Sequence, residues 1–193
     1  MRTRHFCSIL FAAGILTACE DSTTISEPSP ADPALAVSRA VEGITAGGGK
    51  AQLPPGFTLL RFAFNAKLHA DGSATGRFQQ LYESSGGTVD FHGVVTCVSF
   101  DAVNGRAWVG GVITQNNSTN AAVQGAIHQV GRDVWFRVVD NGEGESAADR
   151  TTVFGFEGAA GFITSAAYCA GQPWAANDAN TWAVVEGNLQ VKP

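Results

Sequence analysis

The densest group of acidic side chains lies in a short segment that contains glycine. Residues 140–145 read Asp-Asn-Gly-Glu-Gly-Glu, and Asp149 follows closely. Carboxylate oxygens on a glycine-bent loop are ligands that calcium prefers. The spacing fits a calcium-binding loop only in part, because Gly142 stands where a ligand would be expected. Two interpretations follow: a solvated hairpin loop with acids at its tip, or a calcium site, and no other cofactor is indicated. The candidate ligands are Asp140, Glu143, Glu145 and Asp149.

A second set of side chains could bind a ligand on the face of a β-sheet. Apolar residues alternate with other types over 134–139, so that Trp135 and Arg137 are expected to face away from the core. Similar faces of other strands carry Asn65, Arg77, Gln79 and Asp90. An aromatic ring can stack on a sugar while planar polar groups bond its hydroxyls. The alternatives are an ordinary solvent-facing surface, or a Trp135 that packs inward. The candidate ligand-binding residues are Trp135, Arg137, Arg61, Lys67 and His92.

Enzymatic motifs are not found in the sequence. His69, His92 and His128 each lie on an expected strand or at its end, and none accompanies a recognised nucleophile motif. We therefore expect no catalytic residues. Two carboxylates such as Asp90 and Glu143 could still meet in space, which keeps an envelope glycan hydrolase as the alternative.

Strands are the elements expected to position these residues. Residues 60–69 alternate apolar and polar, which is typical of a half-buried antiparallel strand, and Asp71-Gly72 and Asn104-Gly105 suit hairpin turns. We predict an all-β fold, an antiparallel meander of seven to nine strands forming a small barrel or sandwich, with one long loop insertion. The expected strands cover 60–69, 77–82, 88–100, 107–114, 122–129, 134–139, 151–156 and 189–191.

The expected insertion covers residues 158–182, where the strand pattern stops. This segment is rich in alanine and carries Trp174 and Trp182. So long a loop is uncommon inside a compact domain. The two tryptophans could cap an open end of the sheet or form a small apolar pocket.

The N-terminal residues have the three parts of an export signal: a basic start, an apolar run over 6–16, and small residues before Cys19. The run is too short for a membrane span, which needs about 20 residues. Leu16-Thr17-Ala18-Cys19 resembles the lipobox of bacterial lipoproteins. The resemblance implies removal of residues 1–18 and lipidation of Cys19, which would anchor the protein to a membrane on the extracytoplasmic side of the bacterial envelope. The alternative is an ordinary secretory signal that leaves Cys19 free.

With Cys7 in the expected signal and Cys19 lipidated, Cys97 and Cys169 remain. Two remaining cysteines in an oxidising compartment most simply form a disulfide. Two buried free thiols are the alternative. A zinc site is disfavoured, since two cysteines at this separation lack the paired spacing of zinc ligands.

Composition divides the chain into three parts. Residues 1–18 form the signal, 19–45 a proline-containing acidic tether that is expected to be disordered, and 46–193 the β domain. A helix over 33–42 remains possible within the tether. The chain has 23 glycines and a formal net charge of −5, without a basic stripe. Nucleic acid is therefore not an expected partner.

Several segments of the domain resemble an uncharacterised β-rich accessory domain of secreted bacterial proteins, which often follows anchor-sorting domains. The matching text includes Phe62-Ala63-Phe64-Asn65-Ala66-Lys67, residues 105–111, residues 136–144 and residues 187–191. The resemblance implies a β-rich domain and no catalytic residues. We expect a lipid-anchored envelope protein whose β domain binds or scaffolds a polysaccharide or a protein. A purely structural surface-assembly protein is a further alternative.

Overall fold

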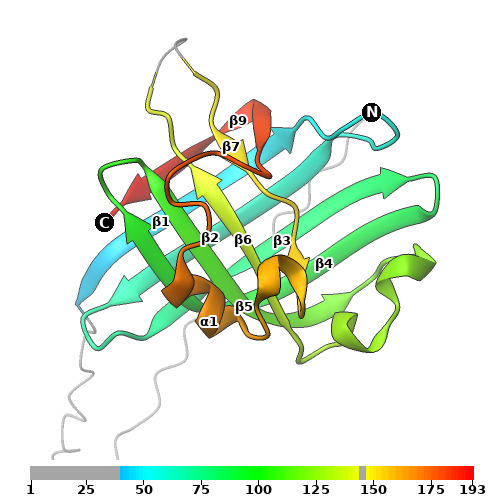
Figure 1. The fold of residues 1–193 in the computed structure, drawn as a ribbon, viewed down its shortest axis with the longest axis horizontal. Helices are drawn as coiled ribbons and strands as arrows, with labels where there is room; N and C mark the ends of the chain where they lie inside the picture. Colours follow the sequence, from blue (N-terminus) through cyan, green and yellow to red (C-terminus); the bar gives the residue numbers. More distant parts are fainter. Residues whose placement is uncertain (1–39, 144–146) are drawn as a thin grey trace, which may run out of the picture. The chain divides into compact units, whose positions relative to one another are not determined.

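The computed structural model describes residues 40–143 and 147–193, and within them the fold is a single antiparallel sheet (Figure 1). The strands are β1 (Val41–Ala51), β2 (Leu60–His69), β3 (Ala74–Ser84), β4 (Gly87–Asp101), β5 (Arg106–Asn116), β6 (Asp133–Val139), β7 (Arg150–Thr151), β8 (Gly155–Phe156) and β9 (Trp182–Lys192). The helical elements are η1 (Ala121–Val123), η2 (Ala126–His128), η3 (Ala159–Gly161) and α1 (Ser165–Gly171). In the described ranges, no helix is long and apolar enough to cross a membrane.

Eight of the strands close into a ring. The order β5-β4-β3-β2-β1-β9-β7-β6 is completed by pairing between β5 and β6, while β8 pairs with β6 alone. The all-β meander expected from the sequence is confirmed, and the ring decides between the two alternatives in favour of a barrel. The weakest seam lies at β7, which pairs with β6 and with β9 over only two residues each.

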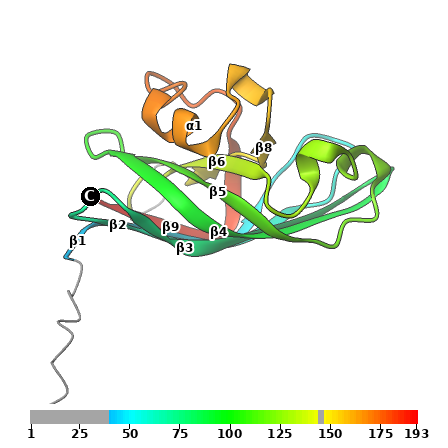
Figure 2. The same ribbon diagram turned by 90° about the horizontal axis from the view of Figure 1, so that it is seen from below.

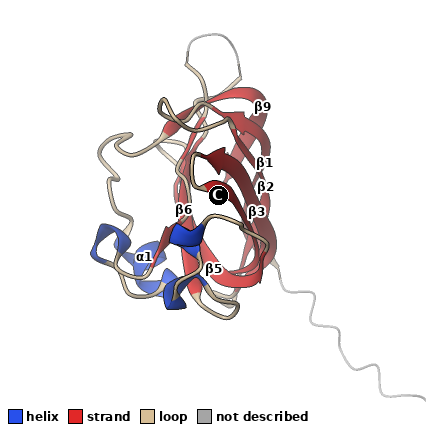
Figure 3. Ribbon diagram, turned by 90° about the vertical axis from the view of Figure 1, so that its right-hand side faces the viewer, coloured by secondary structure: helices blue, strands red, loops and turns tan. Residues whose placement is uncertain are grey.

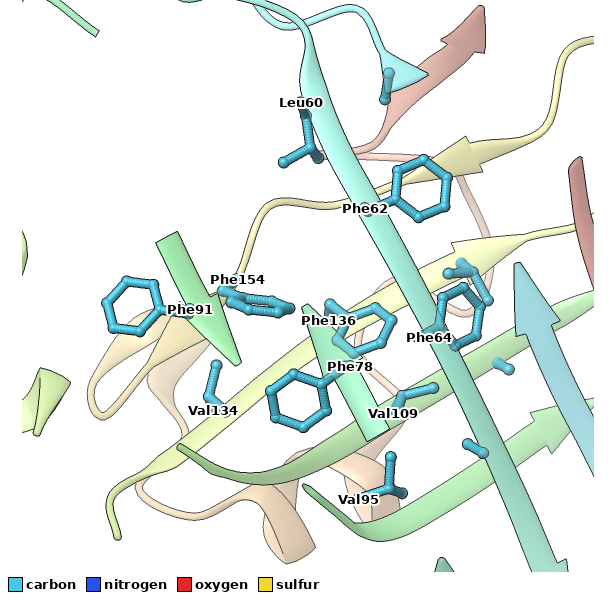
Figure 4. Close-up of a cluster of buried hydrophobic side chains, with 14 of the residues drawn as sticks. Leu60, Phe62, Phe64, Phe78, Phe91, Val95, Val109, Val134, Phe136 and Phe154 are labelled. Carbon is cyan, nitrogen blue, oxygen red and sulfur yellow. The ribbon is translucent and has the colours of Figure 1, made fainter. Parts of the chain in front are cut away.

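Phenylalanine rings fill the interior of the ring (Figure 4). Phe136 packs edge-on against Phe64 and Phe78, with ring centroids 5.2 and 5.9 Å apart. Phe78 needs space that two glycines provide, because a Cβ atom at either Gly93 or Gly111 would clash with its ring. The alternation seen in the sequence therefore reflects one face of each strand buried in this core.

A buried glutamine on β3 pairs with the backbone that follows β7. Gln80 is 2% exposed, its Nε2 donates to the Thr152 carbonyl at 3.0 Å, and its Oε1 accepts from the Phe154 amide at 2.8 Å. Residues 152–154 interrupt the strand that we expected over 151–156. One side chain thus satisfies backbone groups that a continuous ladder would otherwise pair.

Residues 157–181, here called the strap, form a second layer outside the ring (Figure 2). The strap contains η3 and α1 and lies over β5 and β6 (Figure 3). Gly110 permits the close approach of α1, since a Cβ atom there would lie 2.8 Å from the Ser165 Cβ. The expected disulfide is confirmed: Cys97 on β4 is joined to Cys169 on α1. The long insertion is ordered because it is covalently fixed and packed on the sheet.

Two expectations about local structure are wrong. Residues 122–129, expected as a strand, form η1 and η2. The Asn120 side chain accepts a hydrogen bond from the Ala122 amide, and β5 pairs directly with β6, which leaves this segment outside the ladder. The strand β1 begins at Val41, before the domain boundary expected at 46. Residues 41 and 42 are therefore not helical, and residues 33–39 of the alternative helix lie outside the described residues. Thr45 is fully buried there, between β2 and β9.

His128 predicts a pH dependence of stability. Its ring packs edge-on against Phe156 at 4.4 Å, and burial lowers its pKa below the ordinary value of 6.5. The unfolded chain therefore binds a proton at higher pH than the folded protein does. We expect the His128 contribution to stability to be present above pH about 6.5 and to be lost as the pH falls through its folded pKa. Urea unfolding at several pH values between 7 and 5 measures how the free energy of unfolding changes with pH. His128→Phe should make that free energy depend less steeply on pH. An unchanged slope in that variant would contradict the prediction.

Candidate functional site

An open groove of about 650 Å³ lies over strands β2 to β5. Its floor contains small or apolar residues, including Ala63 and Val94. Outward-facing positions of four neighbouring strands supply its polar walls. These polar residues are Asn65, Arg77, Gln79, His92, Thr114 and Gln115. The groove therefore combines a narrow apolar strip with planar hydrogen-bonding groups.

Strand register aligns the polar side chains in cross-strand rows. Asn65 pairs directly with Arg77, and Gln79 pairs with His92. His92 in turn lies opposite Gln115 on β5. Opposite residues on one face of a sheet have Cβ atoms about 4.5–5.5 Å apart, so each row places its side chains within reach of one ligand.

Several of these groups have unused hydrogen-bonding capacity. The Arg77 guanidinium and the Gln79 amide, both on exposed residues, form no hydrogen bond or ion pair with another residue in the described ranges. Among the described residues, the Asn65 side chain forms one hydrogen bond: its Oδ1 accepts from the Arg77 backbone amide at 2.8 Å. The His92 Nε2 lies 3.2 Å from the Asp90 carboxylate, which orients the imidazole ring. The groove thus presents oriented polar groups to solvent.

One end of the groove is cationic. A smaller hollow of about 300 Å³ shares Asn65 and Arg77 with it and adds Lys67 and Thr75. Lys67 forms no ion pair with a described residue. By contrast, Lys50 on β1 lies 2.6 Å from Glu186 and is neutralised. Two neighbouring cations without acidic partners therefore stand out in a chain of net charge −5.

The sequence-predicted ligand residues do not form one platform. His92 lies in the groove, Lys67 at its cationic end, and Arg61 in a separate hollow beside Lys50. Trp135 and Arg137 face outward from β6 as expected, but the expectation that they meet solvent is wrong. They are 2% and 0% exposed because the strap covers them.

Arg137 organises the strap. Its Nη1 donates to the carbonyls of Trp174 at 2.6 Å and Asn177 at 3.0 Å, and its Nη2 donates to Ala179 at 2.8 Å. The guanidinium also lies 5.7 Å from the centre of the Trp174 ring. Burial lowers the pKa of Arg137. The side chain expected to bind a ligand instead binds the protein's own backbone.

The two tryptophans of the long insertion serve different layers. Trp174 packs in the outer cluster with Trp108, Trp135 and Tyr168, whereas Trp182 begins β9 and packs against the interior core. They do not meet in one cap at the end of the sheet.

The acidic segment has a structural role at two of its residues. Asp140 accepts from the amides of Gly142 and Val191, and Asp149 accepts from those of Asn141 and Leu189. Both carboxylates thereby link the 140–149 segment to β9. Glu143 borders a small polar hollow near Asp149. Glu145 lies outside the described residues, among which no group of three or more potential metal-binding side chains occurs. The calcium site stays a prediction.

Sequence reasoning named the outward faces but missed Thr114 and Gln115. Thr114 ended the strand expected over 107–114, and Gln115 lay beyond it. Both line the groove because the register between β4 and β5 shifts at His92 and Gly93, which alternation alone does not predict. Searches with protein-family models, curated proteins and solved structures found no match to this chain. The lipobox resemblance and Cys19 fall on residues outside the described ranges, and the accessory-domain resemblance stays a prediction.

Proposed function

We propose that this chain is a non-catalytic, lipid-anchored envelope protein that binds an acidic polysaccharide along the groove over β2 to β5. One observation carries the proposal: the Arg77 guanidinium and the Gln79 amide have no partner among the described residues, and strand register places them opposite Asn65 and His92 in an open hollow. Scaffolding within the envelope would follow from holding such a polymer near the membrane.

The groove chemistry suits an acidic sugar polymer. Side-chain amides can both donate to and accept from sugar hydroxyls, and Asn65, Gln79 and Gln115 supply three of them. A guanidinium binds carboxylate in a bidentate manner, and Arg77 lies beside Lys67 at the cationic end. The open shape admits a chain that continues past both ends of the hollow.

Binding is favoured over hydrolysis by the composition of the walls. Hydrolysis of a glycoside requires two carboxyl groups flanking the bond. The lining of the groove, which consists entirely of described residues, contains no carboxylate. The Asp90 carboxylate lies outside this lining. It contacts the His92 imidazole and accepts a hydrogen bond from the Asn117 side chain.

The anchor rests on the resemblance of Leu16-Thr17-Ala18-Cys19 to a lipobox. A lipidated Cys19 would confine the domain to ligands close to its own membrane. Metabolic labelling with a fatty-acid probe tests this step, since Cys19→Ser should abolish labelling if Cys19 carries the lipid.

Arg77→Ala should weaken binding to an acidic polymer. A hydrogen bond to a charged group contributes about 1.5–3 kcal/mol, which corresponds to a loss of roughly ten- to a hundredfold in affinity. Calorimetric titration with polygalacturonate oligomers measures the loss, and neutral dextran oligomers serve as the uncharged comparison.

Arg132→Ala is the matched control, because Arg132 is also exposed and lies outside the groove. It removes the same charge and should leave the affinity within twofold. Equal effects of the two substitutions would contradict the groove as the binding site. Release of new reducing ends during the titration would instead favour the hydrolase.

A further inference from the structure

A further hollow, of about 180 Å³, lies between the strap and the sheet at β6 and β8. The sheet contributes Trp135, Phe154 and Gly155 to its walls. The strap contributes Ala159, Tyr168 and Trp174. This hollow, here called the strap pocket, is separate from the groove and shares no lining residue with it.

Aromatic rings give the strap pocket a flat apolar wall. The rings of Trp135 and Tyr168 are stacked with centroids 5.5 Å apart and planes inclined by 21°. Both residues belong to the outer apolar cluster, in which Trp174 is partly buried. Such walls favour planar apolar ligands over strongly hydrated ones.

Two hydrogen-bond donors in these walls have no protein partner. Trp135 is 2% exposed and Tyr168 is 1% exposed, yet neither Trp135 Nε1 nor the Tyr168 hydroxyl forms a hydrogen bond with a described residue. Neither donor atom is among the fully buried, unpaired side-chain atoms of the described residues, so each keeps some contact with solvent. When indole N–H and phenol O–H groups are enclosed, they usually have partners. The equally buried Trp108 shows the ordinary case, since its Nε1 donates to the Pro173 carbonyl at 2.9 Å.

The absence of a side chain at Gly155 keeps the indole nitrogen accessible. A Cβ atom at this position would lie 2.5 Å from Trp135 Nε1. Burial raises the pKa of Tyr168, so its hydroxyl remains a donor throughout the physiological range. Trp135 and Tyr168, each with an unpaired donor, therefore both line one small aromatic hollow.

The backbone around the strap pocket is strained. Among the described residues, four other than glycine have a positive φ, and three of them line this pocket: Ala160 at 56°, Trp174 at 59° and Asn180 at 60°. The left-handed region is costly for alanine and tryptophan. Strain of this kind concentrates at ligand-binding sites, where the surrounding structure holds it in place.

We propose that the strap pocket binds one small planar ring that carries a hydrogen-bond acceptor. A cavity of about 150 Å³ accommodates benzene, so a hollow of about 180 Å³ takes a single substituted ring. The ring stacks along the aromatic wall, and its acceptor receives hydrogen bonds from Trp135 Nε1 and the Tyr168 hydroxyl. The proposal is independent of the groove and of the polysaccharide.

Acetophenone is a suitable probe, because it joins a planar ring to a carbonyl acceptor. Ethylbenzene has nearly the same size and shape but no acceptor. Saturation-transfer NMR with the purified protein, together with tryptophan fluorescence, measures the affinity for each. We expect acetophenone to bind roughly a hundredfold more tightly than ethylbenzene, because each of the two hydrogen bonds contributes up to about tenfold.

Two variants distinguish the contribution of the hydrogen bond from that of the pocket volume. Tyr168→Phe retains the ring and should weaken acetophenone about tenfold while leaving ethylbenzene unchanged. Ala159→Leu fills the pocket and should abolish binding of both probes. Arg77→Ala, which alters only the groove, should change neither affinity. Absence of acetophenone binding to the unaltered protein, or equal acetophenone binding by the unaltered protein and Tyr168→Phe, would overturn the proposal. Far-UV circular dichroism confirms that each variant is folded.

Discussion

Replacing Arg137 with alanine is expected to lower the free energy of unfolding by about 3–5 kcal/mol, because several backbone carbonyls lose a charged donor at once. Arg137 is fully buried and donates to the carbonyls of Trp174, Asn177 and Ala179. With alanine at this position, these carbonyls would lose their donors beneath the strap. The substitution would also leave a void in a close-packed layer. Urea unfolding followed by circular dichroism measures the loss.

The prediction can be separated from a general effect of removing charge. Arg77→Ala also removes an arginine, but from an exposed position, and should change stability by no more than about 0.5 kcal/mol. Arg137→Lys retains the charge without the forked donors, so it should fall between the two. A loss below 1 kcal/mol for Arg137→Ala would show that the strap holds its conformation without this side chain.

Loss of the disulfide is expected to have a comparable effect. Cys97 and Cys169 are 72 residues apart, and in the chain-entropy model a loop of this length stabilises the fold by roughly 4 kcal/mol. The double substitution to alanine should therefore lower the urea midpoint strongly, and tryptophan fluorescence should report exposure of Trp135. The single variant Cys97→Ala should match the double variant in stability once measured under reducing conditions.

The two effects need not add. Arg137 and the disulfide both attach the strap to the sheet, one through β6 and the other through β4. If either attachment alone suffices to hold the strap, the combined variant will lose more stability than the sum of the single losses. Strict additivity would indicate that each fixes its own part of the strap independently.

Local pattern was sufficient for the fold class. Alternation over 60–69 identified β2, because its apolar face lies in the interior and its polar face outside. The disulfide followed from counting cysteines. Strand order did not follow from pattern alone, and for this reason the groove residues Asn65, Arg77 and His92 could be assigned to a face but not gathered into one site.

The error at Trp135 and Arg137 has a physical cause. Alternation distinguishes the two sides of a strand, but it does not report whether another layer covers the outer side. That layer contains only one α-helix, Ser165–Gly171, which is too short for a helical period to be recognised in its sequence. Arg137 gave no signal of the layer either, since its partners are backbone carbonyls that no side-chain pattern reveals.

Closure of the ring has a consequence for the order of folding. The first strand, β1, pairs with the last, β9, along most of its length. Until the C-terminal residues have been synthesised, β1 and β7 each retain an unpaired edge, and the interior phenylalanines remain incompletely enclosed. The nascent chain therefore cannot reach its final topology segment by segment. It must wait for its last eleven-residue strand.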